Sequence, residues 1–122
     1  MANIIPFAFR GELFSGTHNF ANGGNSFKIA LYTGNPYSTS STTYLTGQEV
    51  SASNTGYTTG GKVLASQAVA SGTAVASVDF ADSVLTSATF TAAFAAIYND
   101  DNSDKLCVIL DFGGNKTATN GT

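Results

Sequence analysis

The chain has 122 residues, of which 43% are hydrophobic, so it can form one domain with a substantial core and leaves little room for a second. Charged residues make up only 11% and the net charge is −3; the five Lys and Arg residues stand apart in the sequence, which argues against nucleic-acid binding. No apolar run is as long as a membrane span, and residues 1–6 lack the basic and long apolar regions of a signal peptide, so we expect one domain over residues 1–122 with no membrane partner.

A short amphipathic helix is predicted over residues 7–15. Phe9 and Leu13 have helical spacing, Pro6 precedes them and Gly16 follows, which is the usual order at helix ends. A helix of this length is not stable alone. Phe9 and Leu13 are therefore expected to pack either on the sheet of the domain or on a neighbouring subunit.

A half-buried strand is predicted over residues 26–33, because apolar Phe27, Ile29 and Leu31 alternate with the residues between them. Residues 34–61 form a long stretch that is rich in Gly, Ser, Thr, Asn and Tyr. A loop of this length is uncommon unless it is functional or carries short strands of its own.

Aromatic side chains in this loop and in the predicted helix are the candidate assembly contacts. Tyr37, Tyr44 and Tyr57 lie in the loop. They either cover a sheet edge or make contacts between subunits, where tyrosine is enriched, and the sequence leaves both interpretations open. Phe7 and Phe9 of the helix complete the set.

Four further strands are predicted over residues 62–69, 73–80, 88–98 and 105–112, from alternating apolar residues. Together with the first strand and the helix they indicate a mainly β fold, an antiparallel, jelly-roll-like β-sandwich with one short N-terminal helix, since sheet edges have to be covered. A single sheet backed by the helix is the alternative.

The strands over residues 88–98 and 105–112 are apolar on both faces, so we expect them to be covered on both sides and to form the central hairpin. The polar residues 99–104 would close it. The alanines also permit a helix over residues 84–97. The threonines and the alternating aromatic residues favour the strand.

The acidic segment after residue 99 resembles a calcium-binding loop only superficially. Asp100, Asn102, Asp104 and Asp111 approach the spacing, but Lys105 stands where the sharp turn needs glycine. We therefore expect a solvated hairpin loop and no metal or other cofactor.

Cys107 lies in an apolar run and is expected to be a small core residue. A cysteine nucleophile would need a basic partner, and the only histidine, His18, is far away in the sequence. His18 follows the predicted helix, where a histidine can bond the last helical carbonyl groups and complement the helix dipole. With no catalytic constellation in the sequence, the chain is not expected to be an enzyme.

Several segments, taken in order, resemble a family of small structural proteins from the virions of tailed phages. The chain departs from the family pattern in two places: the family usually continues past residue 120 into a final strand, and residues 38–43 are richer in Ser and Thr. The matching segments are ELFSGTHNF (12–20), FKIALYT (27–33), YLTGQEV (44–50), GYTTGGKVL (56–64), VDFAD (78–82), SATFT (87–91), AIYN (96–99) and LDFGGNKT (110–117).

The resemblance implies a virion component made in the cytoplasm of a host bacterium, and the family has no catalytic residues to transfer. A surface of few charges and many small side chains suits close packing, so we expect a capsid cement or decoration protein. It would bind the major capsid protein as a homo-oligomer, with a trimer favoured. A tail, neck or fibre component is the second hypothesis. A carbohydrate-binding module with Tyr37, Tyr44 and Tyr57 stacked on sugar rings is the third.

Overall fold

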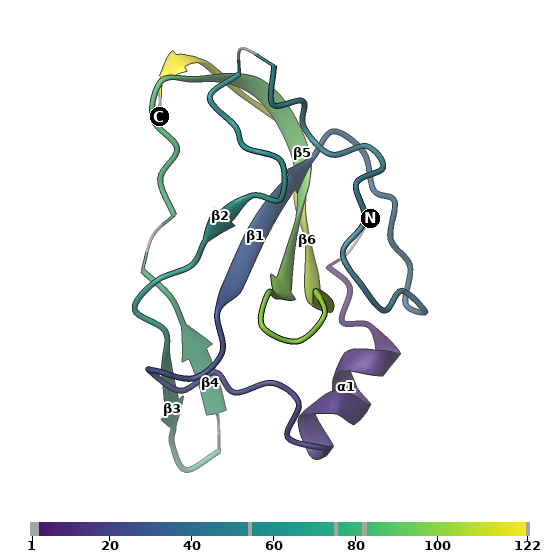
Figure 1. The fold of residues 1–122 in the computed structure, drawn as a ribbon, viewed down its shortest axis with the longest axis vertical. Coiled ribbons are helices and arrows are strands. Elements are labelled where there is room, and N and C mark those ends of the chain that lie inside the picture. The colour runs from purple at the N-terminus through teal and green to yellow at the C-terminus, as the bar shows by residue number, and fades with distance from the viewer. Residues whose placement is uncertain (1–2, 54, 75, 82, 122) are drawn as a thin grey trace.

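The computed structural model describes residues 3–53, 55–74, 76–81 and 83–121. Its strands form two antiparallel sheets, one of four strands in the order β2-β1-β5-β6 and one of two strands, β3 and β4 (Figure 1). The fold is mainly β with one short helix, as predicted, and the two sheets are not closed on one another. The elements are α1 (Phe7–Phe14), β1 (Phe27–Tyr32), β2 (Lys62–Val63), β3 (Ala68–Ser71), β4 (Ala76–Asp79), β5 (Ala88–Asn99) and β6 (Lys105–Gly121).

The first two elements and β5 confirm the predictions from local sequence. Helix α1 begins directly after Pro6, whose backbone is extended, and ends one residue earlier than predicted, before Gly16 with its φ of 72°. Strand β1 lies within the predicted residues 26–33, and β5 extends the prediction by one residue. Residues 84–97 are therefore not a helix.

The predicted central hairpin is only half right, because β5 is central and β6 is not. Strand β5 lies between β1 and β6, whereas β6 is the last strand of its sheet. Two residues outside the named strands bridge to β6, Ile4 to Ile109 and Thr43 to Lys105. These bridges cover part of an edge that the sequence placed in the interior.

Strand β6 is longer than predicted, since it runs on to Gly121 rather than ending at residue 112. Phe94 pairs with Asp111 but Ala92 pairs with Lys116, so β6 carries extra residues at this point. Gly113 lies there with a φ of 77°, a conformation that glycine adopts without strain. The chain therefore continues through Gly113 as a bulge within β6, past residue 112 where the predicted strand ended.

The strand predicted over residues 62–69 is wrong, because the chain leaves the sheet between β2 and β3. Ser66 has a φ of 54°, which a continuous strand does not allow. Leu64 is buried, and the Gln67 amide donates hydrogen bonds to the carbonyl groups of Ala21 and Asn25, at 3.1 and 2.7 Å. Strand β4 lies within the predicted residues 73–80, of which residue 75 is outside the described residues.

The four-stranded sheet is covered on both faces, as the two-faced strands predicted. One face carries a cluster that includes Ala30, Tyr32, Ala96 and Tyr98, under Tyr37 and Tyr44 from the loop over residues 34–61. The other face carries a second cluster, made of Phe27, Ile29, Ile97 and Cys107 from the sheet with Phe9, Phe20, Leu64 and Phe80. Phe20 stacks on Phe27 with ring centroids 4.3 Å apart. The described part of the loop contains no helix or strand of its own.

Candidate functional site

Tyr37 of the long loop points inward and belongs to the protein core. Its hydroxyl lies 2.5 Å from that of Tyr32 on β1, and it accepts a hydrogen bond of 2.9 Å from the backbone N–H of Leu45. The Tyr32 hydroxyl donates to the Leu45 carbonyl oxygen at 2.7 Å. Tyr32 and Tyr37 thus connect the loop to the sheet through hydrogen bonds. These bonds satisfy both hydroxyl groups, as is usual for buried polar groups.

Tyr44 and Tyr57 converge on one carboxylate, that of Glu49. Tyr57 donates to Oε2 of Glu49 at 2.5 Å, Tyr44 donates to Oε1, and the backbone N–H of Gly60 donates to Oε2 at 2.8 Å. Burial, followed by the hydrogen bond to Glu49, raises the pKa of both tyrosines above the usual value. Both hydroxyls therefore stay protonated and donate to the carboxylate.

These contacts decide between the two interpretations of the loop tyrosines. Tyr37 and Tyr57 are only 5% and 3% exposed, and half-buried Tyr44 stacks on Tyr98 with ring centroids 4.6 Å apart. As contacts to another subunit, Tyr37 and Tyr57 have almost no surface to offer. They cover the sheet, and their buried rings are also inaccessible to a sugar.

The two helix phenylalanines lie in different environments. Phe9 is half-buried and packs against His18 and Phe20, at centroid distances of 5.1 and 6.2 Å. Phe7 is 61% exposed, with the guanidinium of Arg10 lying 5.4 Å from its ring centroid. Of the five predicted contacts, Phe7 alone presents most of its surface to solvent.

His18 holds a buried chain of polar side chains that the sequence did not reveal. Its Nε2 lies 2.9 Å from Oε1 of Glu12, and its Nδ1 lies 3.0 Å from Nδ2 of Asn99. The Glu12 carboxylate also pairs with Lys105 at 3.5 Å. The prediction that His18 bonds the last carbonyl groups of the helix is wrong, since its partners are side chains of α1 and of the end of β5.

The same histidine lies beside the only cysteine, because Cys107 Sγ is 3.9 Å from His18 Nδ1 across 89 residues of sequence. A thiol, an imidazole and a carboxylate in this order can support nucleophilic catalysis. Here burial, followed by the charge of Glu12, raises the pKa of the thiol to about 12. Nδ2 of Asn99 can only donate, so Nδ1 of His18 accepts and Nε2 of His18 carries the proton towards Glu12.

The thiol of Cys107 therefore stays protonated at neutral pH, and a protonated thiol is a poor nucleophile. Cys107 is 2% exposed, in agreement with its prediction as a core residue. The imidazole of His18 links α1 to the end of β5 through hydrogen bonds and so stabilises the position of α1 on the sheet. No local signal could have paired these residues, because only the fold brings them together.

The acidic loop turns its side chains in different directions. Asp101 Oδ2 accepts from the backbone N–H of Ser26 at 2.7 Å, and the Asn102 amide donates to the Thr17 carbonyl oxygen at 2.6 Å. Asp100 lies 3.7 Å from the Lys28 ammonium group. In the part of the chain that the structure describes, no cluster of His, Cys, Asp and Glu side chains is placed to hold a metal ion.

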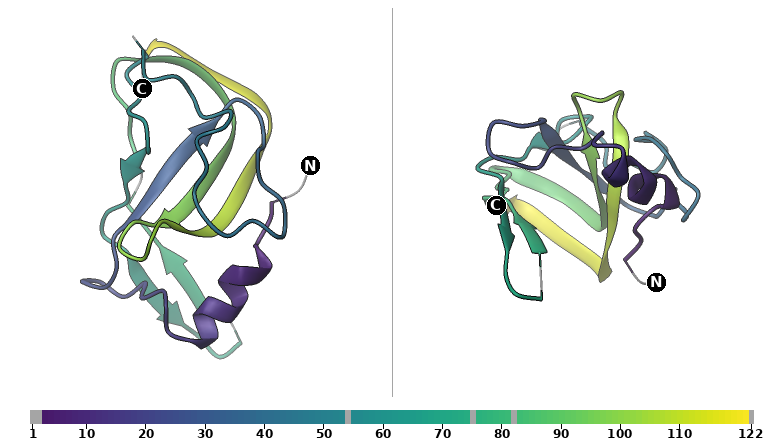
Figure 2. Two further views of the ribbon diagram at one scale, coloured as in Figure 1. Left: turned by 45° about the vertical axis from the view of Figure 1, so that its right-hand side comes forward. Right: turned by 90° about the horizontal axis from the view of Figure 1, so that it is seen from below.

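The main exposed apolar surface lies at the end of the molecule that carries α1 and the β3–β4 hairpin (Figures 1 and 2). Every described residue of β3 and β4 is exposed. Phe14, the last residue of α1, is 94% exposed. Between α1 and the hairpin is an apolar groove of about 530 Å³, lined by Ile5, Phe9, Leu13, Phe20, Ala76, Val78, Phe80, Ile97, Cys107 and Val108.

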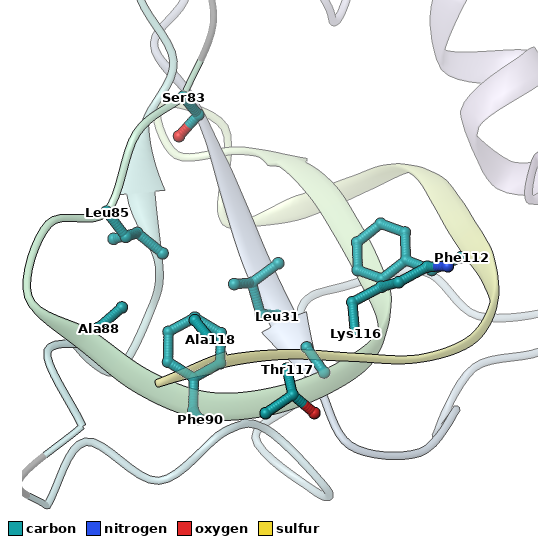
Figure 3. Close-up of a pocket in the computed structure, with 10 residues that line it drawn as sticks. Leu31, Ser83, Leu85, Ala88, Phe90, Phe112, Lys116, Thr117 and Ala118 are labelled. Atoms are coloured by element: carbon teal, nitrogen blue, oxygen red, sulfur yellow. The ribbon is translucent and has the colours of Figure 1, made fainter. Parts of the chain in front are cut away.

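A second apolar groove, of about 520 Å³, lies against the other half of the β5–β6 pair. Figure 3 shows Leu85, Phe90 and Phe112 around Leu31, with Lys116 as the charged residue in its lining. Phe90 and Phe112 also pack against the third core cluster, which contains Val50, Tyr57 and Ala92. Both grooves thus border the core, since the groove beside α1 is lined in part by Phe9, Phe20, Phe80, Ile97 and Cys107 of the second cluster.

No protein-family model, no curated protein and no solved structure matches this chain. Among the described residues, no helix is long and apolar enough to span a membrane. Helix α1 has only eight residues.

Proposed function

We propose that this chain is a structural protein of a phage virion, most simply a decoration protein on the outer capsid surface, and that it works by docking rather than by catalysis. The observation that carries the proposal is the β3–β4 hairpin, which stands apart from the main sheet with all its described residues exposed. The resemblance of its segments to small tailed-phage virion proteins is the reason for proposing a virion as the assembly to which the chain docks.

An isolated two-stranded hairpin is at best marginally stable in water. Proteins that stay monomeric protect such strand edges with charges, proline or bulges. Strand β3 has the sequence AVAS and none of these features, and β4, with the sequence ASVD, has a single charge at its end. A partner that covers the hairpin would supply the burial that the chain itself does not.

The β-sandwich expected from the sequence belongs to the same proposal. Within one chain, loop and helix residues cover the second face of the four-stranded sheet, and β3 and β4 form only a two-stranded layer of their own. A neighbouring subunit seated against the hairpin and α1 would complete the second layer. The capsid position and the trimer stay predictions, and a tail, neck or fibre component is the alternative within the same class.

The number of copies in purified virions tests the proposal. Quantitative mass spectrometry of particles from a phage that encodes this chain should find it in amounts that approach those of the major capsid protein. A small symmetric number of copies would favour a tail or neck component instead. Particles without this chain would refute the proposal.

A matched pair of variants tests whether the hairpin is the docking surface. Val69 on β3 and Val63 on β2 are 56% and 52% exposed. Val69→Asp should reduce the number of copies per particle at least tenfold, because it buries a charge at the contact. Val63→Asp introduces the same charge elsewhere and should leave the number unchanged. Equal effects of the two variants would exclude the hairpin as the docking surface.

A further inference from the structure

We infer that the groove around Leu31 and Phe90 binds a medium-chain aliphatic carboxylate. The head group of this ligand lies at Lys116, and its alkyl chain runs along β5 towards Ala88. None of the ten residues that line the groove belongs to α1, β3 or β4. The inference therefore concerns a small-molecule site apart from the proposed docking surface, and it goes beyond the proposed function.

The groove has the size and the lining of a small-molecule site. Its volume of about 520 Å³ falls within the roughly 300–1,000 Å³ of typical ligand pockets, which are mostly apolar with a few polar groups. Seven of its ten lining residues are Ala, Leu or Phe. The four larger of these side chains are half-buried, so each still has apolar surface that a ligand can remove from water: Leu31, Leu85, Phe90 and Phe112.

Small side chains between large ones leave the hollow along the strands. On β5, Ala88 and Ala92 flank Phe90 at alternate positions, which share one face of a strand. On β6, Ala118 pairs with Phe90. Ala88 and Ala92 are four residues apart, which spans roughly 13 Å at about 3.3 Å per residue in a strand. This length suits an extended alkyl chain better than a compact ring.

The charged residue of the lining lies at one end of the groove. Lys116 pairs with Ala92 between β6 and β5. In Figure 3, Lys116 lies at the end marked by Phe112, and Ala88 lies at the opposite end. The Lys116 side chain is exposed, so a head group beside it stays in contact with water. A ligand with a polar head and an apolar tail fits this arrangement.

Lys116 also differs from two other lysines in its charge partners. Lys28 and Lys105 pair with Asp100 and Glu12, at 3.7 and 3.5 Å. In the part of the chain that the structure describes, no carboxylate lies within ion-pair distance of Lys116. A monovalent carboxylate matches this single ammonium group. A phosphate group carries close to two charges and three strong acceptor oxygens, which one lysine does not satisfy.

Isothermal titration calorimetry of the purified full chain tests the inference with two ligands of equal tail length. Decanoate and decyltrimethylammonium are titrated below the concentrations at which they form micelles. We expect decanoate to bind with a dissociation constant below about 1 mM. It should bind at least about fivefold tighter than the cation, a modest factor because Lys116 is exposed. The net charge of −3 favours the opposite order, so this preference reports a local positive charge.

Substitutions at Lys116 test the position of the head group. Lys116→Gln should weaken decanoate binding about fivefold and remove the preference over the cation, and Lys116→Glu should invert the preference. Arg10→Gln is the matched control, because it removes an exposed positive charge from α1, outside the groove. It should leave the affinity for decanoate unchanged. Equal losses for Lys116→Gln and Arg10→Gln would overturn the inference, since the net charge alone would then explain them.

A variant inside the groove tests the position of the alkyl chain. Ala118 is half-buried, and Ala118→Leu places a larger side chain where the tail would lie. It should weaken the binding of both ligands at least about tenfold. Ala70→Leu makes the same change on exposed β3 and should alter neither affinity. Circular dichroism should show the same spectrum for every variant, and the exposed Lys116 variants decide the inference if Ala118→Leu perturbs the fold.

Two further results would overturn the inference: no binding of decanoate at millimolar concentration, or equal affinities for decanoate and the cation. Both results leave the proposed function standing, because that proposal depends on the hairpin and not on this groove. Conversely, virions that lack the chain would refute the proposed function and leave the carboxylate site standing. The two failures are therefore distinguishable.

Discussion

The long loop over residues 34–61 is more buried, and the β3–β4 hairpin is more exposed, than the composition of each segment suggests. The loop is rich in polar residues, yet it buries Tyr37 and Tyr57 against the sheet. The hairpin is made mostly of Ala, Val and Ser, yet all its described residues are exposed. Polarity of a segment therefore did not determine its burial in this protein.

The difference follows from where each segment finds partners. The loop supplies hydroxyl groups that reach backbone groups and the Glu49 carboxylate, so its polar atoms are satisfied after burial. Among the residues that the structure describes, β3 and β4 pair only with each other, so the outer edge of each has no strand beside it. The loop is complete within one chain, and the hairpin is not.

The largest effect that would support this comparison is expected at Phe27. It is 0% exposed and packs between Phe20 and Phe80, with centroid distances of 4.3 and 6.1 Å. Phe27→Ala should lower the free energy of unfolding by about 3–5 kcal/mol, through lost burial and the cavity left behind. Phe14→Ala, measured by urea denaturation at a concentration where the chain is monomeric, should change it by less than about 0.5 kcal/mol. Similar losses for the two variants would contradict the comparison.

The next largest effect is expected at Glu49, which holds the loop together. Glu49→Ala leaves the hydroxyl groups of Tyr44 and Tyr57 and the N–H of Gly60 without their acceptor. We expect a loss of about 2–4 kcal/mol in the free energy of unfolding, because three donors are left in a largely buried site. Asp79→Ala on the exposed hairpin is the control and should be nearly neutral. A neutral Glu49→Ala would show that the loop does not depend on this carboxylate.

The buried tyrosines predict an alkaline limit to stability. Burial raises the pKa of Tyr57 in the folded chain above the ordinary value near 10. The contribution of the neutral Tyr57 side chain to the free energy of unfolding is fully present below about pH 10. This contribution is lost as the pH rises further, because only the unfolded chain then releases the proton. Tyr57→Phe should reduce the slope of stability against pH above 10 by about 1.4 kcal/mol per pH unit. Denaturation between pH 8 and 12 measures it, and an unchanged slope would contradict the burial of this hydroxyl.

The smallest effect is expected when the same substitution, Val→Thr, is made once in the core beneath the loop and once on the hairpin. Val50 is 4% exposed in the cluster with Tyr57, and Val69 is 56% exposed on β3. Val50→Thr should cost about 1–3 kcal/mol, because it buries a hydroxyl among apolar side chains. Val69→Thr should stay within about 0.5 kcal/mol in the monomer. Equal costs in thermal denaturation of the two variants would mean that the hairpin is covered within one chain.

The sequence by itself determined the elements whose pattern is local. The alternation in β1 and β5, and Pro6 and Gly16 at the ends of α1, gave these elements within about one residue. Two apolar faces on β5 also predicted correctly that the sheet is covered on both sides. Such patterns need no knowledge of distant residues, because the side-chain periods of helix and strand act over a few positions.

Only the tertiary structure decided which residues meet across the fold. The contact of His18 with Cys107 joins residues 89 positions apart, and Glu49 gathers its tyrosines through the course of the loop. The continuation of β6 past Gly113 depends on β5 being there to pair with it. Backbone preferences allowed either a turn or a bulge at this glycine, and the hydrogen bonds of the neighbouring strand selected the bulge.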